Sequence, residues 1–128
     1  MTSATEVYEY AVIRVVPRPD REEFINAGII LFCKRKRFLK AVCQLDENRL
    51  KALFPDCELP TIADNLRSLE AIASGSSKAG PIALLETAER FRWLTAVRST
   101  MIQTSRPHPG LTQDPESCLT ILLTDLVP

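Results

Sequence analysis

The side chains best suited to chemistry near the start of the chain are those of Arg14, Glu23 and Asn26. Arginine offers a planar fork of donors to a carboxylate or phosphate, glutamate can act as a general base, and an asparagine amide can orient either group. All three lie around the loop between two strand-like apolar runs, so a strand–loop–strand unit can bring them to one end of a sheet. A structural alternative pairs Arg14 with Glu22 or Glu23 across the loop and uses Asn26 to cap the turn before Gly28.

A second group of candidate binding residues surrounds the only tryptophan of the chain, and comprises Arg92, Trp93 and Arg98. Arginines beside an exposed aromatic ring can hold phosphates or stack on a base. The alternative is that Trp93 packs in the core while the arginines are solvated or paired. Glu86 and Glu89 are near enough in a helix to neutralise part of this charge.

Two further features carry charge or a titratable ring. The run Lys34, Arg35, Lys36 and Arg37 predicts a basic hairpin tip of the kind that contacts a phosphate backbone. A solvated tip that discourages pairing at the sheet edge explains the same run. His108 lies between two prolines and can act as an acid or base near neutral pH, but no serine or cysteine is placed as its nucleophilic partner, so an ordinary loop histidine is the alternative.

Composition narrows the classes of function. The 128 residues include 16 basic and 16 acidic side chains, so no net field attracts nucleic acid or anionic lipid. Four scattered cysteines and one histidine predict free thiols and no structural zinc site, and we expect no cofactor. No apolar run approaches the roughly 20 residues of a membrane span, and no signal-peptide pattern is present, so we expect a cytoplasmic protein. The common phosphate-loop, dinucleotide, zinc-protease and esterase signatures are missing from the sequence, which therefore fixes no reaction.

Hydrophobic patterning predicts one α+β domain over residues 1–128, with 1–6 as a frayed tail. Strands are expected at 7–16, 27–33, 38–44 and 99–105, giving a mainly antiparallel sheet of about four strands, three early and one late. Three or four helices are expected to pack with it, over 46–54, 60–74, about 84–97 and from 115 onward, with caps at Asp46, Gly75 and Asp114. Residues 20–26 are expected to form a helical turn capped by Asp20. Residues 106–110 are expected to form a loop whose prolines end the sheet.

Several runs of the sequence resemble the motifs of one bacterial family, catalogued as a domain of unknown function, number three-zero-three-seven. The resemblance spans nearly the whole chain. Val97 departs from the family pattern, where we expect a proline, and the hairpin tip is more basic than usual. The runs that carry the resemblance are Tyr8-x-Tyr10-Ala11-Val12-Ile13-Arg14-x-Val16-Pro17, Arg21-Glu22-Glu23-Phe24-x-Asn26-x-Gly28-Ile29-Ile30-Leu31-Phe32, Arg90-Phe91-Arg92-Trp93-Leu94-Thr95-Ala96-x-Arg98-Ser99-Thr100 and His108-x-Gly110-Leu111-Thr112-x-Asp114-Pro115.

The resemblance implies an accessory protein without a known activity. Members of the family are small proteins often encoded beside a HipA-like kinase, which implies a protein partner of that kind, bound through the sheet or the arginine and tryptophan region. Two alternatives stay open: a small phosphate- or nucleotide-handling enzyme, and a nucleic-acid-binding module that uses residues 34–37 and 90–98. The family's motif positions, which would also form the enzyme's pocket apart from the tryptophan, fall on Arg14, Glu23, Asn26, Trp93, Arg98 and His108.

Overall fold

The computed structural model describes residues 4–96 and 100–128. In this part of the chain a five-stranded antiparallel sheet is combined with four α-helices and two short 3-10 turns, so the predicted α+β class is confirmed. The strands are β1 (Glu6–Val15), β2 (Ile25–Cys33), β3 (Phe38–Cys43), β4 (Ile102–Thr104) and β5 (His108–Thr112). The helical elements are α1 (Glu47–Leu53), α2 (Leu59–Ser74), η1 (Ser77–Ala79), η2 (Pro81–Leu84), α3 (Thr87–Leu94) and α4 (Pro115–Leu126).

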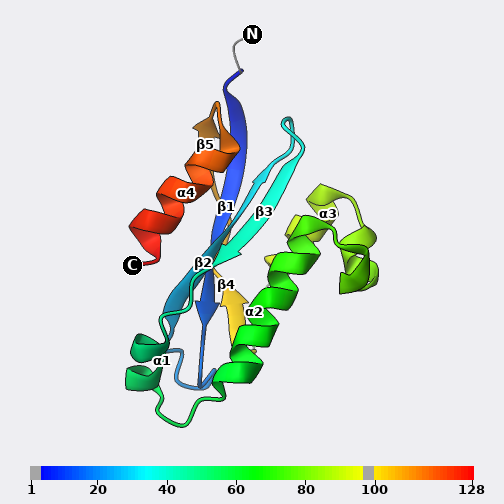
Figure 1. The fold of residues 1–128 in the computed structure, drawn as a ribbon. Coiled ribbons are helices and arrows are strands. Elements are labelled where there is room, and N and C mark those ends of the chain that lie inside the picture. Colours follow the sequence, from blue (N-terminus) through cyan, green and yellow to red (C-terminus); the bar gives the residue numbers. More distant parts are fainter. Residues whose placement is uncertain (1–3, 97–99) are drawn as a thin grey trace.

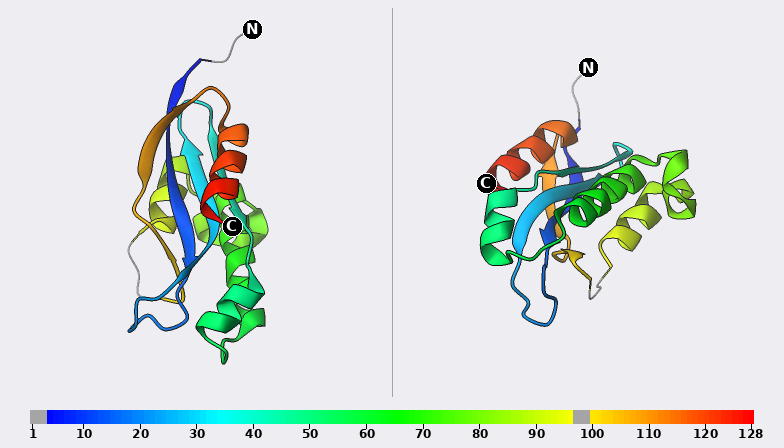
Figure 2. Two further views of the ribbon diagram at one scale, coloured as in Figure 1. Left: turned by 90° about the vertical axis from the view of Figure 1, so that its left-hand side faces the viewer. Right: turned by 60° about the horizontal axis from the view of Figure 1, so that its bottom comes forward.

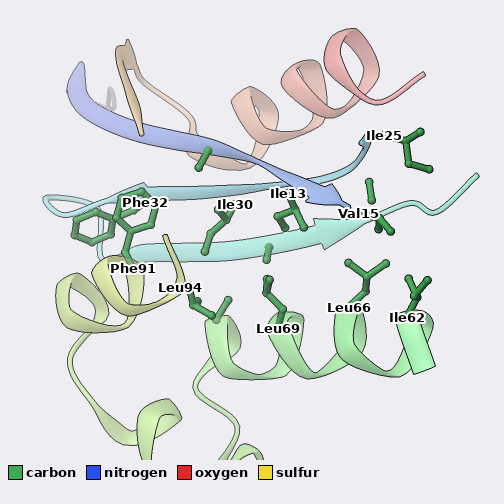
Figure 3. Close-up of a cluster of buried hydrophobic side chains, with 14 of the residues drawn as sticks. Ile13, Val15, Ile25, Ile30, Phe32, Ile62, Leu66, Leu69, Phe91 and Leu94 are labelled. Carbon is green, nitrogen blue, oxygen red and sulfur yellow. The ribbon is translucent and has the colours of Figure 1, made fainter. Parts of the chain in front are cut away.

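The elements form three layers, with the sheet in the middle (Figures 1 and 2). Strand order is β3-β2-β1-β4. β5 pairs with the first half of β1, on the same edge as β4, which pairs with the second half. Helices α2 and α3 cover one face of the sheet, and α4 lies on the other (Figure 3). None of the described helices has both the length and the apolar character needed to cross a membrane.

Alternation along β1 assigns its side chains to the two layers. Ile13 and Val15 are fully buried in the core under α2 and α3, whereas Val12 belongs to the smaller core under α4. The even-numbered Tyr8 and Tyr10 pack on the α4 side with Val12, as the period of two requires. β2 is buried on both faces along nearly its whole length, as its unbroken apolar run predicted.

Local signals set the ends of the helices. Asp46 and Asp114 accept hydrogen bonds from the backbone amides of Arg49 and Ser117, so both predicted N-caps are confirmed. Gly75 ends α2 with a φ of 77°, a left-handed conformation that favours glycine, and its predicted cap is confirmed. The inner stripe of α2 is buried against the sheet and consists of Ile62, Leu66, Leu69 and Ala73.

The predicted loop at residues 106–110 is wrong, because His108–Thr112 forms β5 and extends the sheet along β1. Pro109 lies opposite Glu9 in an edge strand, where the proline nitrogen can face away from β1 and no ladder donor is lost. β4 and β5 follow the same side of β1 with registers that differ by one residue, so the segment between them is a bulge. Ser105 secures this bulge, since its amide donates to the Val12 carbonyl and its Oγ accepts from the Val12 amide, both at 2.9 Å.

The predicted helical turn at residues 20–26 is also wrong. The segment forms tight turns in which the amides of Arg21 and Glu22 donate to the carbonyls of Arg18 and Pro19, and its last residues already belong to β2. Glu22 has a φ of 57°, which cannot continue a right-handed helix. The Asp20 carboxylate binds the Arg18 guanidinium instead of capping a helix, and this hydrogen bond lowers the pKa of the carboxyl group.

Two other elements are shorter than predicted. The helix expected over 84–97 divides into η2 and α3, and Leu84, expected on the inner face, is 70% exposed. The strand expected over 99–105 is formed only by Ile102–Thr104 among the described residues. Residues 97–99, including Arg98, lie outside the described part of the chain.

Candidate binding cleft

A cleft of about 290 Å³ opens between α2, the end of α3 and β4. Its size is close to the lower limit of roughly 300–1,000 Å³ typical of small-molecule pockets. The described residues that line it are Asn65, Ser68, Leu69 and Ile72 from α2, Trp93 and Leu94 from α3, Ile102, Gln103 and Thr104 from β4, and Ala96, Thr100 and Met101 from the connection. We call this site the Trp93 cleft.

Packing beneath the Trp93 cleft fixes its walls. On α3, Phe91 and Leu94 are buried, and the Phe91 ring stacks on Phe32 of β2 with 5.2 Å between centroids (Figure 3). On α2, Leu69 is buried one turn from the cleft-lining Ile72. The two walls therefore come from elements anchored in the main core, so the cleft is built on rigid parts of the fold.

The described lining of the Trp93 cleft carries no ionisable side chain. Its polar groups are hydroxyls and amides, which can donate or accept hydrogen bonds without charge. Thr104 Oγ1 is buried and has no hydrogen-bond partner in the described structure. The described lining can therefore form a hydrogen bond with a polar atom of an occupant through Thr104 Oγ1.

Trp93 stands at the lip of the cleft with 38% of its surface exposed, so the core-packing alternative for this side chain is wrong. Its neighbour Arg92 is exposed on α3. Tryptophan and arginine are two of the residue types enriched among the hot spots of protein interfaces. Arg98, the third predicted member of this group, lies outside the described residues.

Arg14 and Asn26 come together, but on the other face of the sheet. They are register partners on β1 and β2, and the Arg14 guanidinium carbon lies 4.2 Å from the centroid of the Phe24 ring. Asn26 Nδ2 donates to the Leu126 carbonyl at 2.9 Å, so this amide caps the end of α4 rather than the turn before β2.

The structural alternative that pairs Arg14 with Glu22 or Glu23 is not observed among the described residues. Glu23 binds Arg21 at 2.6 Å, close to the loop surface, whereas Arg14 lies within β1 and stacks on Phe24. Both members of the Arg21–Glu23 pair are about half exposed, so this contact contributes little to stability.

His108 lies on β5 opposite Tyr10, and the two rings have centroids 5.4 Å apart. Tyr10 and Arg14 are four residues apart on β1, which separates their backbone positions by about 13 Å. The described candidates therefore divide into four places: Arg14 with Asn26, Glu23 with Arg21, His108 with Tyr10, and the Trp93 cleft on the opposite face.

The basic tip formed by residues 34–37 closes the β2–β3 hairpin. The Arg37 amide donates to the Lys34 carbonyl at 3.1 Å, and Arg37 has a φ of 52°. Glu6 and Glu9 line the same shallow hollow as Lys34 and Arg35, so acidic groups partly balance the tip. Its exposure agrees with a solvated hairpin turn that protects the sheet from pairing with another edge.

Sequence reasoning missed a contact between Tyr8 and Cys118 under the start of α4. A hydrogen bond with Cys118, reinforced by burial, raises the pKa of Tyr8 to about 12. A Cβ added to Gly110 would lie 2.5 Å from the Tyr8 ring, so this ring occupies the space above glycine on the neighbouring strand. The alternating tyrosines opposite a glycine were the signal that could have predicted this packing.

The thiols match the prediction of free cysteines, since all four are unpaired in the described structure. Burial, with a smaller contribution from the Glu70 carboxylate, raises the pKa of Cys43 to about 12. Among the described residues, no three histidine, cysteine, aspartate or glutamate side chains converge as a metal site requires.

Comparison with known proteins gives one match. No curated protein and no solved structure matches the chain. One family model does match, over residues 10–127, and confirms the family expected from the sequence motifs. The chain therefore belongs to the family described as Protein of unknown function (DUF3037).

Proposed function

We propose that this protein is a non-enzymatic accessory protein that binds a protein partner at the Trp93 cleft. The observation that carries the proposal is the cleft itself, which combines an exposed tryptophan with a described lining of apolar, hydroxyl and amide groups. Tryptophan supplies large contact area at low entropic cost and is enriched among residues that dominate binding energy.

The chemistry of the lining favours binding over catalysis. General acid–base catalysis needs a side chain that can transfer a proton near neutral pH, and the described lining supplies hydroxyls and amides instead. Arg92, exposed beside Trp93, adds a positive charge outside the cleft that can meet an acidic group on a partner.

The family resemblance supports a HipA-like kinase as the candidate partner, because relatives are often encoded beside one. The test mixes the purified full-length chain with the kinase encoded nearest to it and measures the dissociation constant by calorimetry. Trp93→Ala should weaken the complex by about thirtyfold, the effect of losing a tryptophan hot spot.

Leu111→Ala is the matched control, since Leu111 is a large exposed side chain on β5 and lies outside the cleft. It should leave the dissociation constant unchanged. A complex that Trp93→Ala does not weaken would place the interface elsewhere. Absence of any complex would remove the kinase as the partner.

A further inference from the structure

We propose that the partner contributes an extended segment that pairs with the outer edge of β4 and inserts an uncharged side chain into the Trp93 cleft. This inference rests on the function proposed above and adds the mode of binding. Addition of a strand to an exposed sheet edge is a common way to bind a peptide, with main-chain hydrogen bonds giving affinity and pockets giving specificity.

The register of β4 shows which of its groups face outward. Gln103 is the register partner of Arg14, and the flanking Ser105 amide donates to a β1 carbonyl. Because backbone groups alternate in direction along a strand, the amides of Ile102 and Thr104 and the Thr104 carbonyl point away from β1. The Ile102 carbonyl on this side already accepts from the Thr100 hydroxyl at 2.6 Å.

The other sheet edges carry proline, lysine or a capped amide, whereas β4 is protected only by its shortness and by the Thr100 hydroxyl on the Ile102 carbonyl. Pro109 in β5 has no amide hydrogen to offer an incoming strand. On β3, the Cys43 amide donates to the Glu70 carboxylate at 2.9 Å, and Lys40 adds a charge. Proline, capping groups and lysine are the usual protections of an edge strand. Ile102–Thr104 contains no proline and no charged residue, and its two outward amides and the Thr104 carbonyl are the groups that a partner strand would meet.

The same residues that present this edge also line the cleft. Ile102 and Thr104 contribute to the wall of the Trp93 cleft while their amides face outward. A strand paired there places alternate side chains over the cleft, because side chains on one face repeat every second residue. The volume of about 290 Å³ suits one or two such side chains rather than a larger ligand.

The charge of the cleft indicates the chemistry of the inserted side chain. The described lining offers apolar, hydroxyl and amide groups, against which an ionised group would lose part of its hydration, and this favours an uncharged inserted residue. Thr104 Oγ1, buried and without a partner in the described chain, can bond with a polar atom of the incoming segment. The occupant is therefore a strand-forming peptide segment whose inserted side chain is uncharged.

The test selects peptides from a displayed random library against the immobilised full-length chain and measures each synthetic binder by the fluorescence of Trp93, the only tryptophan. The expected binders are strand-forming and have one uncharged residue whose replacement by a charged residue abolishes binding. They should lose affinity about tenfold when the backbone amides on one side of the peptide are N-methylated. Methylation of the alternate amides should have no effect, because those amides face away from β4.

Thr104→Pro removes one outward amide and should weaken binding about tenfold, whereas Thr104→Val keeps that amide and should keep main-chain pairing. The N-methyl series decides the question even if Thr104→Pro fails to fold. Binders that change Trp93 fluorescence but are insensitive to N-methylation would overturn the paired strand and leave the partner-binding cleft intact. Absence of any binder that alters this fluorescence would reject both. A dimer of the chain that buries Trp93 would assign the edge to a second copy and overturn the proposal.

Discussion

Ser105→Ala tests the contact that joins β4 to β5. Ser105 is 6% exposed, and its Oγ accepts from the Val12 amide at 2.9 Å and donates to the Arg106 carbonyl at 3.0 Å. Alanine removes both bonds and leaves the Val12 amide buried without an acceptor. Such an unsatisfied donor costs about 1–3 kcal/mol. This is a substantial share of the roughly 5–15 kcal/mol that stabilises a typical domain.

The measurement is urea unfolding of the full-length chain, in which a lower midpoint at an unchanged slope reports a loss of stability. Thr120→Ala on α4 is the matched control, because its hydroxyl donates to the Glu116 carbonyl on an exposed helix surface. The control should change the free energy of unfolding by less than about 0.5 kcal/mol. Ser105→Ala should also speed amide exchange in β5 more than in β2, since it loosens the sheet locally. A stability loss no larger than that of the control, with β5 exchange unchanged, would refute this account of the bulge.

Three further substitutions test other contacts. Gly28→Ala should lower the free energy of unfolding by more than about 2 kcal/mol, because the new Cβ would lie 2.5 Å from a carbonyl of β3. A smaller loss in urea unfolding would show that β2 and β3 can move apart to accommodate the methyl group. Glu70→Ala should cost about 1–2 kcal/mol in the same assay by leaving the Cys43 amide at the sheet edge without its acceptor, and wild-type stability would contradict that role. Cys118→Ala should bring the pKa of Tyr8 from about 12 toward its ordinary value of 10.0, measured by tyrosinate absorbance in a background without the other tyrosine. The raised pKa favours the neutral phenol in the fold, so the stability it contributes is complete below the unfolded pKa and is lost as the pH rises through about 12. If the pKa of Tyr8 stays at about 12 in Cys118→Ala, burial alone accounts for the raised value.

Elements with strong local signals could be predicted from the sequence. The caps at Asp46, Gly75 and Asp114 are short-range features that depend on a few neighbouring residues, and each fixes the end of a helix where expected. The apolar run of β2 likewise requires burial on both faces in any fold of this size. Local chemistry and global packing agree at these positions.

The errors at Pro109 and Asp20 have different physical origins. Proline breaks a central strand but not an edge, and the position of Pro109 at an edge is known only once β5 is placed beside β1. Asp20 has the side chain of an N-cap, yet Pro19 accepts a turn hydrogen bond and Arg18 takes the carboxylate. Long-range pairing therefore decides the conformation at Pro109, whereas at Asp20 contacts with neighbouring residues replace the helix cap.

The candidate site shows the same division. Trp93 could be selected because it is the only tryptophan and lies among arginines, and the structure places it at the lip of a cleft. The opposite wall, which includes Asn65 and Ser68, has no sequence signal, because these are ordinary exposed positions of an amphipathic helix. Their role depends on the distance between α2 and β4, which only the assembled fold sets.

The register of β4 affects both the stability of the sheet and the shape of the Trp93 cleft. Side chains alternate along a strand, so a slip of one residue would turn Ile102 and Thr104 out of the cleft and change its wall. Ser105 holds that register through its paired bonds to Val12, which makes a buried hydroxyl on the strand a requirement for the shape of the cleft. If β4 slips in Ser105→Ala, the fluorescence of Trp93 in the free protein must change along with stability. If only stability falls, the bonds to β1 stabilise the sheet while the pairing of Ile13 with Thr104 is sufficient to shape the cleft.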